Sequence, residues 1–548
     1  MGPEGAGGVA QVIARLREMG AVPLDAWHVA ALLEMEGWSD EDARRLDYPD
    51  LFALARAAYS EAVRAVDRTF VPARPARTLL RRLATDAWRF LRGVMFAMPM
   101  VISGWASLAV GLSLWAYAGF DVPEATGIAI AVLASFLATG GFTQAMSRRG
   151  LFLISLRQTA LARRTALQFV AAGILWAAVA GIGLGLVLML VPVLRWETIR
   201  MALLYYPYLC LIWLFLGLLY MLQREFTFTA VVAAGIGVVY LLVHSPLLAG
   251  LPVHTAVLIA HAVGLTWCAA MSGALALWFF ARRAHGEAPE SGGRRISEHW
   301  PSVIIQVYPF FLYGLFYFAF LFTDRVLAWS VPGLSPQALW FTGRYESGMT
   351  WASLALLLPM GVVEVGIHRF VGLLFREQPG VVLAARSPDL GRRVIRLWRR
   401  LQTGVIAAGA LAVLLTELLM HLLVRTGTLY VAPLLDPVSG WVFGWAAVGY
   451  VLLAGGLLNV LMLFITNQPW PAVRATVTAL AVSLAVGFVA SRFWYRCFAA
   501  TGCTPDTLLR YPQAAAGLVA GALVFWWLSG RAVRRALDGA DYLLYLNA

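Results

Sequence analysis

Lysine is absent from this chain of 548 residues, so all 43 of its basic residues are arginine. This absence excludes a Walker-A lysine, a Schiff-base lysine and a Ser-Lys dyad, and it argues against ATP hydrolysis by the chain. Only four cysteines occur, with no Cys-x-x-Cys pair and no His/Cys cluster, so no metal site and no cofactor are predicted. A Gly-x-Ser-x-Gly elbow and a His-Glu-x-x-His helix are also missing, which disfavours an enzyme.

Charged residues are scarce as well, at 13% of the chain against 60% hydrophobic residues. Apolar stretches of 18 or more residues recur along most of the length, and each can cross a bilayer. The sequence therefore predicts an all-α polytopic membrane protein of about twelve transmembrane helices. The spans are expected near 94–118, 125–146, 166–194, 201–222, 228–247, 255–281, 302–323, 347–372, 401–424, 441–466, 471–491 and 511–530.

Arginine placement predicts the orientation of these spans. If both termini are cytoplasmic, the inner segments hold 27 arginines and the outer segments eight, as the positive-inside rule requires for an inner cell membrane. The net charge of +13 then follows from topology, so anionic membrane lipid is an expected partner and nucleic acid is not. The outer arginines are Arg195, Arg200, Arg325, Arg344, Arg425, Arg492, Arg496 and Arg510.

Composition divides the chain into four predicted parts. A cytoplasmic helical unit ends in an amphipathic interfacial helix, and two six-helix membrane lobes follow, separated by a polar cytoplasmic linker. Because six is an even number, the lobes would be parallel repeats around a central cavity. The predicted parts are residues 1–93, 94–281, 282–300 and 301–548, the last with a cytoplasmic tail.

The N-terminal unit contains short predicted helices, with Ser39 as N-cap and Asp42 at the capping-box position. We expect it to act as a docking or stabilising cap, so residues 1–90 are a candidate surface for a cytoplasmic protein partner. The amphipathic segments 77–93 and 388–402 are both expected to lie on the inner membrane surface. Anionic lipid is the preferred ligand for the arginines of 388–402, with a pyrophosphate head group as the alternative.

The seventh span is unusually aromatic, with ten aromatic residues among the 23 of segment 308–330. It also carries a polar stripe, because steps of four and seven residues place its polar side chains on one helical face. Such a face must meet protein or water within a bilayer, so we expect it to line a water-accessible cavity. The stripe consists of Ser302, Gln306, Tyr313, Tyr317 and Asp324.

The eighth span repeats the pattern with Glu346, Thr350, Ser353, Glu364 and His368 on one face. Substrate-cavity candidates are therefore Gln306, Tyr313, Tyr317, Thr350 and Ser353. Glu364 lies deep in the span with His368 one turn away, an arrangement that could bind and release a coupling proton. Pairing of Glu364 with His368 or with an arginine of a neighbouring helix is the equally weighted alternative.

Further candidates for coupling or gating lie near the predicted outer ends of the spans. Asp324 and Arg325 are expected to form salt bridges with Arg344 and Glu346 across the seventh-to-eighth loop and to close that mouth. Glu417 forms an i, i+4 pair with His421 and is read first as a paired carboxylate near the interface.

Two cysteines, Cys497 and Cys503, fall six residues apart in the last outward loop. In an oxidising exterior they could form a small-loop disulfide, which a Cα separation well above about 7 Å would rule out.

The seventh and eighth spans resemble those of polysaccharide exporters in the multidrug/oligosaccharidyl-lipid/polysaccharide flippase superfamily, nearest the Pel exopolysaccharide transporter branch. The resemblance rests on an aromatic span with Tyr313 and Gly314 at its core, the pair Asp324-Arg325 at its end, and an apolar helix with Glu364 embedded. It implies two six-helix lobes that alternate between inward- and outward-open states and move a polysaccharide or lipid-linked glycan outward. The long N-terminal unit departs from the family's usual short start.

Two other functions remain open from the residues alone. An ion-coupled secondary transporter of a small or amphipathic solute would use the same architecture. A membrane-embedded glycosyl-transfer enzyme is less favoured, because no outward loop is long enough to hold the acidic site that such enzymes use.

Overall fold

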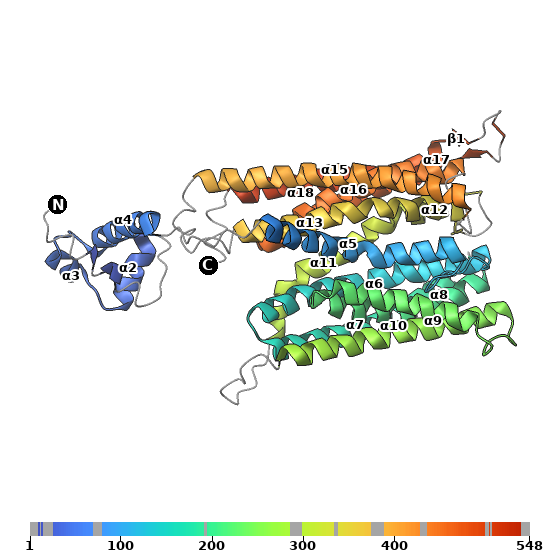
Figure 1. The fold of residues 1–548 in the computed structure, drawn as a ribbon, viewed down its shortest axis with the longest axis horizontal. Coiled ribbons are helices and arrows are strands. Elements are labelled where there is room, and N and C mark those ends of the chain that lie inside the picture. Colours follow the sequence, from blue (N-terminus) through green and yellow to red (C-terminus); the bar gives the residue numbers. More distant parts are fainter. Residues whose placement is uncertain are drawn as a thin grey trace. The chain divides into compact units, whose positions relative to one another are not determined.

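The structure, a computed structural model, describes residues 9–10, 12–14, 26–69, 79–190, 194–284, 299–333, 338–373, 388–427, 436–498, 503–504 and 507–538. Within them the chain is almost entirely helical, as predicted (Figure 1). The first nine labelled helices are α2 (Ala26–Met35), α3 (Asp40–Arg45), α4 (Leu51–Thr69), α5 (Leu79–Val110), α6 (Val122–Ser155), α7 (Thr159–Leu190), α8 (Trp196–Met221), α9 (Glu225–Val243) and α10 (Val253–Ala284).

The remaining elements follow the predicted linker, of which residues 285–298 lie outside the described part of the chain. They are α11 (Trp300–Trp329), α12 (Gly343–Ala352), η1 (Ser353–Leu356), α13 (Leu357–Val371), α15 (Pro388–Thr426), α16 (Pro437–Ile465), α17 (Pro469–Phe493), β1 (Arg496–Cys497), β2 (Leu508–Leu509), η4 (Tyr511–Ala514) and α18 (Ala515–Asp538).

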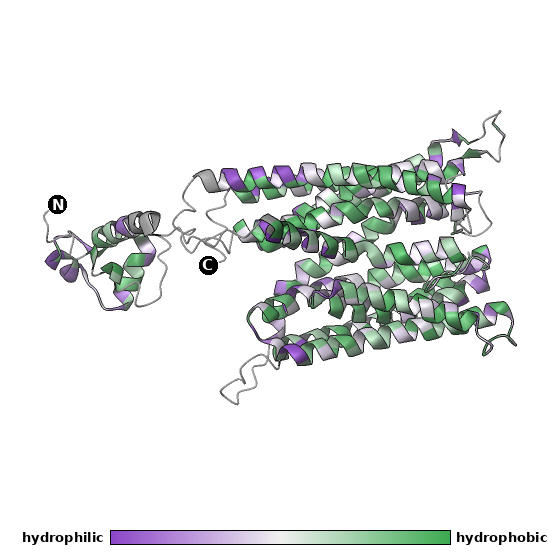
Figure 2. Cartoon of the chain, in the orientation of Figure 1, coloured by the Kyte–Doolittle hydropathy of each residue, from purple (hydrophilic) through white to green (hydrophobic). Residues whose placement is uncertain are grey.

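The predicted count of spans is confirmed among the described residues. Twelve helical stretches are long and apolar enough to cross a membrane, and each overlaps one of the predicted spans. Figure 2 shows hydrophobic residues along these helices and hydrophilic residues gathered toward the N-terminal end of α15. The chain is thus a multi-pass membrane protein by length and composition of its helices.

Two boundaries were predicted wrongly. The segment 77–93 is not a separate surface helix, because α5 runs without a break from Leu79 to Val110. The first span therefore begins about ten residues earlier than predicted, and it ends before a turn in which Leu112 and Tyr117 form a β-bridge. Likewise, 388–402 belongs to the single 39-residue helix α15. At about 1.5 Å per residue, such a helix is roughly twice as long as a hydrocarbon core is thick.

The eighth span contains a break that has a local cause. Pro359 lacks a backbone N–H, so the carbonyl four residues before it cannot receive the usual helical hydrogen bond. The chain tightens into the 3₁₀ turn η1 between α12 and α13 at this place. Such a turn within a span often marks a hinge or a strained sequence.

Helix starts in the membrane part follow the capping rules. The backbone N–H of Asp121 donates to Glu124 Oε2 at 3.1 Å, which closes a capping box before α6. Asp436 accepts from the backbone N–H of Ser439 at 3.0 Å, and Pro437 occupies the first turn of α16. Proline is favoured there because its missing donor would be unsatisfied in any residue.

Contacts divide the chain into two compact units. One comprises Met1–Trp88, Val365–Leu401 and Val533–Ala548, and the other comprises Arg89–Glu364 and Gln402–Ala532. In the second unit, spans two to six share one hydrophobic core, which begins at Leu112 after α5 and includes Val303 and Val307 of α11. The predicted division into lobes 94–281 and 301–548 remains a prediction.

The described N-terminal helices of the first unit have a small core of their own. Val29, Leu33 and Leu54 are fully buried in it. The predicted capping box is present, since the backbone N–H of Ser39 donates to Asp42 Oδ2 at 2.9 Å. The Ser39 hydroxyl also donates to Asp42 Oδ2, at 2.8 Å, and this bond and the backbone bond together lower the pKa of Asp42.

Candidate functional site

Two pairs of helices from the first six and the last six spans meet at glycines. In the first pair, α6 approaches α11 so closely that a Cβ on Gly314 would lie 2.8 Å from Gln144 Cγ and would clash with the backbone of Gly140. In the second pair, α5 approaches α12, and a Cβ on Gly104 would lie 2.5 Å from Thr350 Cγ2. If the two sets of six spans were parallel repeats, span one would correspond to span seven and span two to span eight. The contact between spans two and seven would then correspond to the contact between spans eight and one.

The predicted inner end of the seventh-span stripe is polar and open. Ser302 and Gln306 are exposed, and Gln306 Oε1 accepts from Arg149 Nη1 of α6 at 3.1 Å. Next to this contact, Arg148 Nη2 donates to Asn467 Oδ1 at 3.1 Å. Arginines of α6 thus reach side chains of the last six spans at this end.

The middle of the stripe is aromatic and closed. Tyr313 is only 3% exposed, and its ring centroid lies 5.0 Å from that of Phe464. Tyr317 is partly buried and stacks on Tyr313, with ring centroids 5.7 Å apart. The structure therefore places the two tyrosines together on the helix α11 that contacts α6, where the sequence predicted a cavity face.

The other end of the stripe belongs to a buried polar cluster. The Tyr345 hydroxyl donates to Asp324 Oδ2 at 2.7 Å. Arg325 Nε donates to Glu346 Oε2 at 3.1 Å, and Arg325 Nη2 donates to the Tyr450 hydroxyl at 3.2 Å. We call these five residues, from α11, α12 and α16, the buried acidic cluster.

Asp324 was expected at the mouth of the loop between spans seven and eight. In the structure it is 0% exposed, with the Tyr345 hydroxyl of α12 bonded to its carboxylate. Among the described residues, Asp324 Oδ1 and Glu346 Oε1 have no hydrogen-bond partner. The cluster thus holds two carboxylates and a single arginine, which pairs with Glu346. Such an arrangement is costly in a membrane interior and therefore marks a functional candidate.

Of the predicted salt bridges across this loop, one is formed and one is replaced. Arg325 and Glu346 pair as expected. Arg344 instead lies 3.4 Å from Asp436 at the start of α16, with its side chain 60% exposed. Exposed pairs of this kind contribute little to stability, about 0–1 kcal/mol.

In the eighth span, the polar face lies toward α5. The Thr350 methyl group meets Gly104, and the Ser353 hydroxyl donates to the Thr350 carbonyl at 2.6 Å. Glu364 Oε1 lies 3.8 Å from Arg92 Nη2, and its side chain is 28% exposed. Glu364 therefore lies beside an arginine of a neighbouring helix, as the structural alternative to proton coupling predicts.

Arg92 was missed as a site residue, because the sequence placed it in the tail before the first span. It lies within α5 and makes two bonds to Glu225 at the start of α9, of 2.9 and 3.3 Å. Its side chain is 18% exposed and that of Glu225 13%. Glu225 lies 133 residues away in the chain, so no local pattern connects the two.

Two further candidates, His368 and Glu417, lie on α13 and α15. His368 is partly buried in the last turn of α13. Glu417 is exposed on α15, and His421 Nδ1 bonds to the Glu417 backbone carbonyl at 2.8 Å rather than to its carboxylate.

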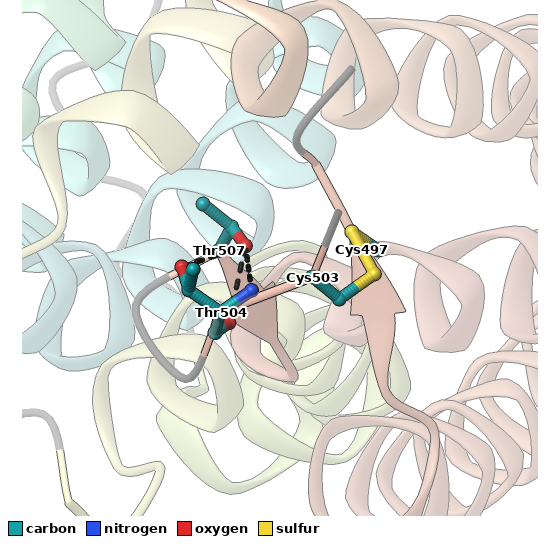
Figure 3. Close-up of a disulfide and its surroundings, with 4 residues drawn as sticks. All are labelled: Cys497, Cys503, Thr504 and Thr507. Atoms are coloured by element: carbon teal, nitrogen blue, oxygen red, sulfur yellow. Dashed lines mark hydrogen bonds between the residues drawn. A yellow bond between two sulfur atoms is a disulfide. The ribbon is translucent and has the colours of Figure 1, made fainter. Parts of the chain in front are cut away.

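The structure joins Cys497 and Cys503 in a disulfide, with Cα atoms 5.7 Å apart (Figure 3). This separation falls within the limit set from the sequence. Beside it, the backbone N–H of Thr504 donates to Thr507 Oγ1 at 2.9 Å. Cys210 and Cys268 are free and buried.

No protein-family model matches the chain, and no curated protein matches it either. Solved structures match its fold. They include an outward-facing multidrug resistance MATE transporter of the MOP superfamily, at 15% identity and a TM-score of 0.50, covering 83% of this chain and 97% of that one. A MOP superfamily transporter from Pyrococcus furiosus matches at 15% identity, a TM-score of 0.50 and coverages of 82% and 96%. A MATE structure in the straight conformation matches at 14% identity, a TM-score of 0.50 and coverages of 83% and 97%. The chain has the fold of MATE transporters of the MOP superfamily.

Proposed function

We propose that this chain is an alternating-access exporter that moves a polysaccharide or lipid-linked glycan outward across the inner cell membrane. One observation carries the proposal: spans one and two meet spans eight and seven through glycine contacts, at Gly104 and at Gly140 with Gly314. Where Gly140 meets Gly314 the backbones touch directly, and beside this α6–α11 contact Phe136 stacks on Phe318 with ring centroids 4.8 Å apart. Alternating access needs contacts between the two sets of spans that break and reform in each cycle.

A glycan substrate is supported by the side chains beside these contacts. Tyrosine rings such as Tyr313 and Tyr317 can stack on the C–H faces of sugar rings, and their hydroxyls can bond sugar hydroxyls. The resemblance of spans seven and eight to the Pel exporter branch supports the same substrate class. In this proposal both termini are cytoplasmic, in accord with the arginine distribution.

The second candidate is an ion-coupled transporter of a small or amphipathic solute. It is favoured by one of the matching structures, which is described as a multidrug resistance transporter. The fold fits either substrate, and the buried acidic cluster would serve ion coupling in both.

The N-terminal helices are proposed to bind a cytoplasmic protein partner. Trp27 and Phe52 form an exposed aromatic pair with ring centroids 4.8 Å apart, and they are 71% and 40% exposed. Exposed aromatic side chains of this size are enriched at protein interfaces.

A deletion strain tests the main proposal. We expect it to lose surface polysaccharide and to regain it when the full chain is supplied, while efflux of fluorescent amphipathic cations stays unchanged. Normal surface polysaccharide together with lost dye efflux would overturn the glycan proposal in favour of the second candidate.

A further inference from the structure

A carboxylate lies on the lipid-facing side of α15. Glu417 is exposed there beside Leu414 and Leu418, which are 63% and 66% exposed. Thr416 and Met420, on the other side of the helix, are only 4% and 1% exposed. Figure 1 shows α15 along the edge of the helical bundle, and α15 is one of the twelve helices that can cross a membrane. The exposed side of this span, with Glu417 on it, therefore faces lipid.

Glu417 also lies too deep in the span to reach water. Arg425, the next arginine toward the outer end, lies two helical turns further on, about 12 Å at 1.5 Å per residue. Toward the inner end the next charged residue is Arg400, about 25 Å away on the same scale. A glutamate side chain is much shorter than either distance. An ionisable group exposed to hydrocarbon is costly, so such groups are normally covered by protein.

The described part of the chain supplies no cover for this carboxylate. His421, one turn away, bonds through Nδ1 to the Glu417 backbone carbonyl at 2.8 Å. A carbonyl only accepts, so Nδ1 carries a hydrogen and Nε2 is left for another group. Neither the Glu417 carboxylate nor His421 Nε2 has a partner among the described residues. Arginine, lysine and histidine are also absent from the sequence of the undescribed segments on the predicted outer side, which are 191–193, 334–337, 428–435, 499–502 and 505–506.

The lipid-facing side of α15 has the spacing of a helix-packing surface. Exposed residues recur along it at steps of four and three, which is the heptad spacing of two helices that pack along each other. Small residues in its inner half allow two backbones to approach closely, and polar residues in its outer half can form hydrogen bonds between membrane helices. We call this surface the α15 seam, and it consists of Thr403, Ala407, Ala410, Leu414, Glu417 and His421.

A second copy of the chain complements the α15 seam. Two copies with the same orientation in one membrane are related by a two-fold axis along the membrane normal, so their α15 helices run parallel. In a parallel seam each side chain inserts between seam residues of the other helix, which brings Glu417 against His421 of the partner subunit and the reverse. One proton per pair, held by the carboxylate or by the ring, forms the hydrogen bond and leaves the pair neutral.

We infer that the α15 seam is the interface of a homodimer within the membrane, in which two reciprocal Glu417–His421 pairs remove both carboxylates from lipid. A different membrane protein would need its own matching groups at the same depth, whereas one chain supplies both members of this pair. The interface uses span nine and not the glycine contacts of spans one, two, seven and eight, so it does not depend on which substrate is moved.

Cysteine cross-linking of the full chain in native membranes tests the interface. One added cysteine would replace Leu414, on the seam, or Leu415, which is 48% exposed at the same depth and points away from the seam. We expect oxidation to give a covalent dimer of differently tagged copies with Leu414→Cys and little with Leu415→Cys. The native cysteines do not interfere, because two are buried and the other two are bonded to each other.

Energy transfer between labelled copies, diluted stepwise in liposomes, tests the polar pair. Glu417→Ala and His421→Ala should each weaken the dimer about tenfold or more, because each removes both hydrogen-bonded pairs. Leu422→Ala is the matched control, since Leu422 is 57% exposed beside the seam, and it should associate like the unaltered chain. The double exchange Glu417→His with His421→Glu should restore most of the affinity, because it regenerates each pair with its members reversed. All variants should keep the melting temperature.

The homodimer is overturned if the unaltered chain is monomeric at every dilution, or if Leu414→Cys and Leu415→Cys cross-link equally. Unchanged association of both alanine variants would overturn it too. A seam cysteine that cross-links in native membranes only to another protein would assign the seam to that protein instead. If both alanine variants are impaired and the double exchange restores nothing, the reciprocal pairing is wrong.

Discussion

Tyr345 donates its hydroxyl to Asp324 at 2.7 Å, and both side chains are completely buried. The bond links α12 to α11 inside the buried acidic cluster, where Asp324 Oδ1 has no partner among the described residues. A buried carboxylate with so few donors depends strongly on each one that it has.

Tyr345→Phe is therefore expected to destabilise the folded protein by about 1–3 kcal/mol, because it leaves Asp324 Oδ2 without its donor in a closed space. Differential scanning fluorimetry of the detergent-solubilised chain would measure the shift in melting temperature. Tyr308→Phe is the control, since Tyr308 lies on α11, the helix of Asp324, and is 47% exposed. Equal melting of both variants and the unaltered chain would show that the bond contributes nothing.

The burial of Asp324 could not be predicted from the sequence, and the reason is physical. The pattern of polar residues correctly places Asp324 on the face of Tyr313 and Tyr317, because that face follows from helical geometry alone. Whether the end of the helix is open depends on what packs over it. The residues that pack there include Tyr345 and Tyr450. Tyr450 is 125 residues from its partner Arg325, so no local pattern predicts their contact.

The first span was predicted from the sequence, but its start was misplaced. The count of twelve spans could be predicted, because each span is a long apolar run. The start of the first was placed too late because the arginine-containing segment 77–93 was taken for a separate helix on the membrane surface. Arg92 is instead paired with Glu225, through a contact that only the folded chain creates.

A second prediction concerns the contact between α6 and α11. Gly314→Ala places a methyl group 2.8 Å from Gln144 Cγ and against the backbone of Gly140, so the two helices must move apart. If this contact opens during transport, the variant should favour the separated state. Electron–electron resonance between spin labels at exposed positions of α6 and α11 should then show a longer distance population.

Gly444→Ala is the control for that experiment. Gly444 lies within α16, and a Cβ added there meets nothing within 4 Å. Alanine at such a position should leave the distances unchanged and should slightly favour the helix. An unchanged distance distribution in Gly314→Ala would contradict the proposal that this interface opens.

A third prediction concerns access of water to the polar faces. Single cysteines at Gln306, Tyr313, Tyr317 and Ser353 should react with a membrane-impermeant thiol reagent, whereas a cysteine at Phe320 should not. Gln306 should react fastest, because it is already exposed, and Tyr313 should depend on opening of the pathway. Phe320 is a suitable control because it is fully buried and packs on Phe525 of α18, away from the α6 contact. Uniform protection of all four polar positions would exclude a cavity along this face.

The last prediction concerns Glu364, for which proton coupling and structural pairing both remain open. Arg92 lies 3.8 Å from Glu364 and keeps two bonds to Glu225, so loss of the Glu364 charge leaves this arginine paired. We therefore expect Glu364→Gln to be produced and folded normally. If Glu364 carries the coupling proton, the variant should lose export at every pH, because glutamine keeps the shape and cannot titrate. Glu225→Gln removes the closer partner of a largely buried arginine and should lower the amount of folded protein instead, since breaking such a pair costs about 3–5 kcal/mol. Surface polysaccharide and membrane protein level, measured together for both variants, separate the two roles. Full export by Glu364→Gln across a pH series would assign this carboxylate to structure alone.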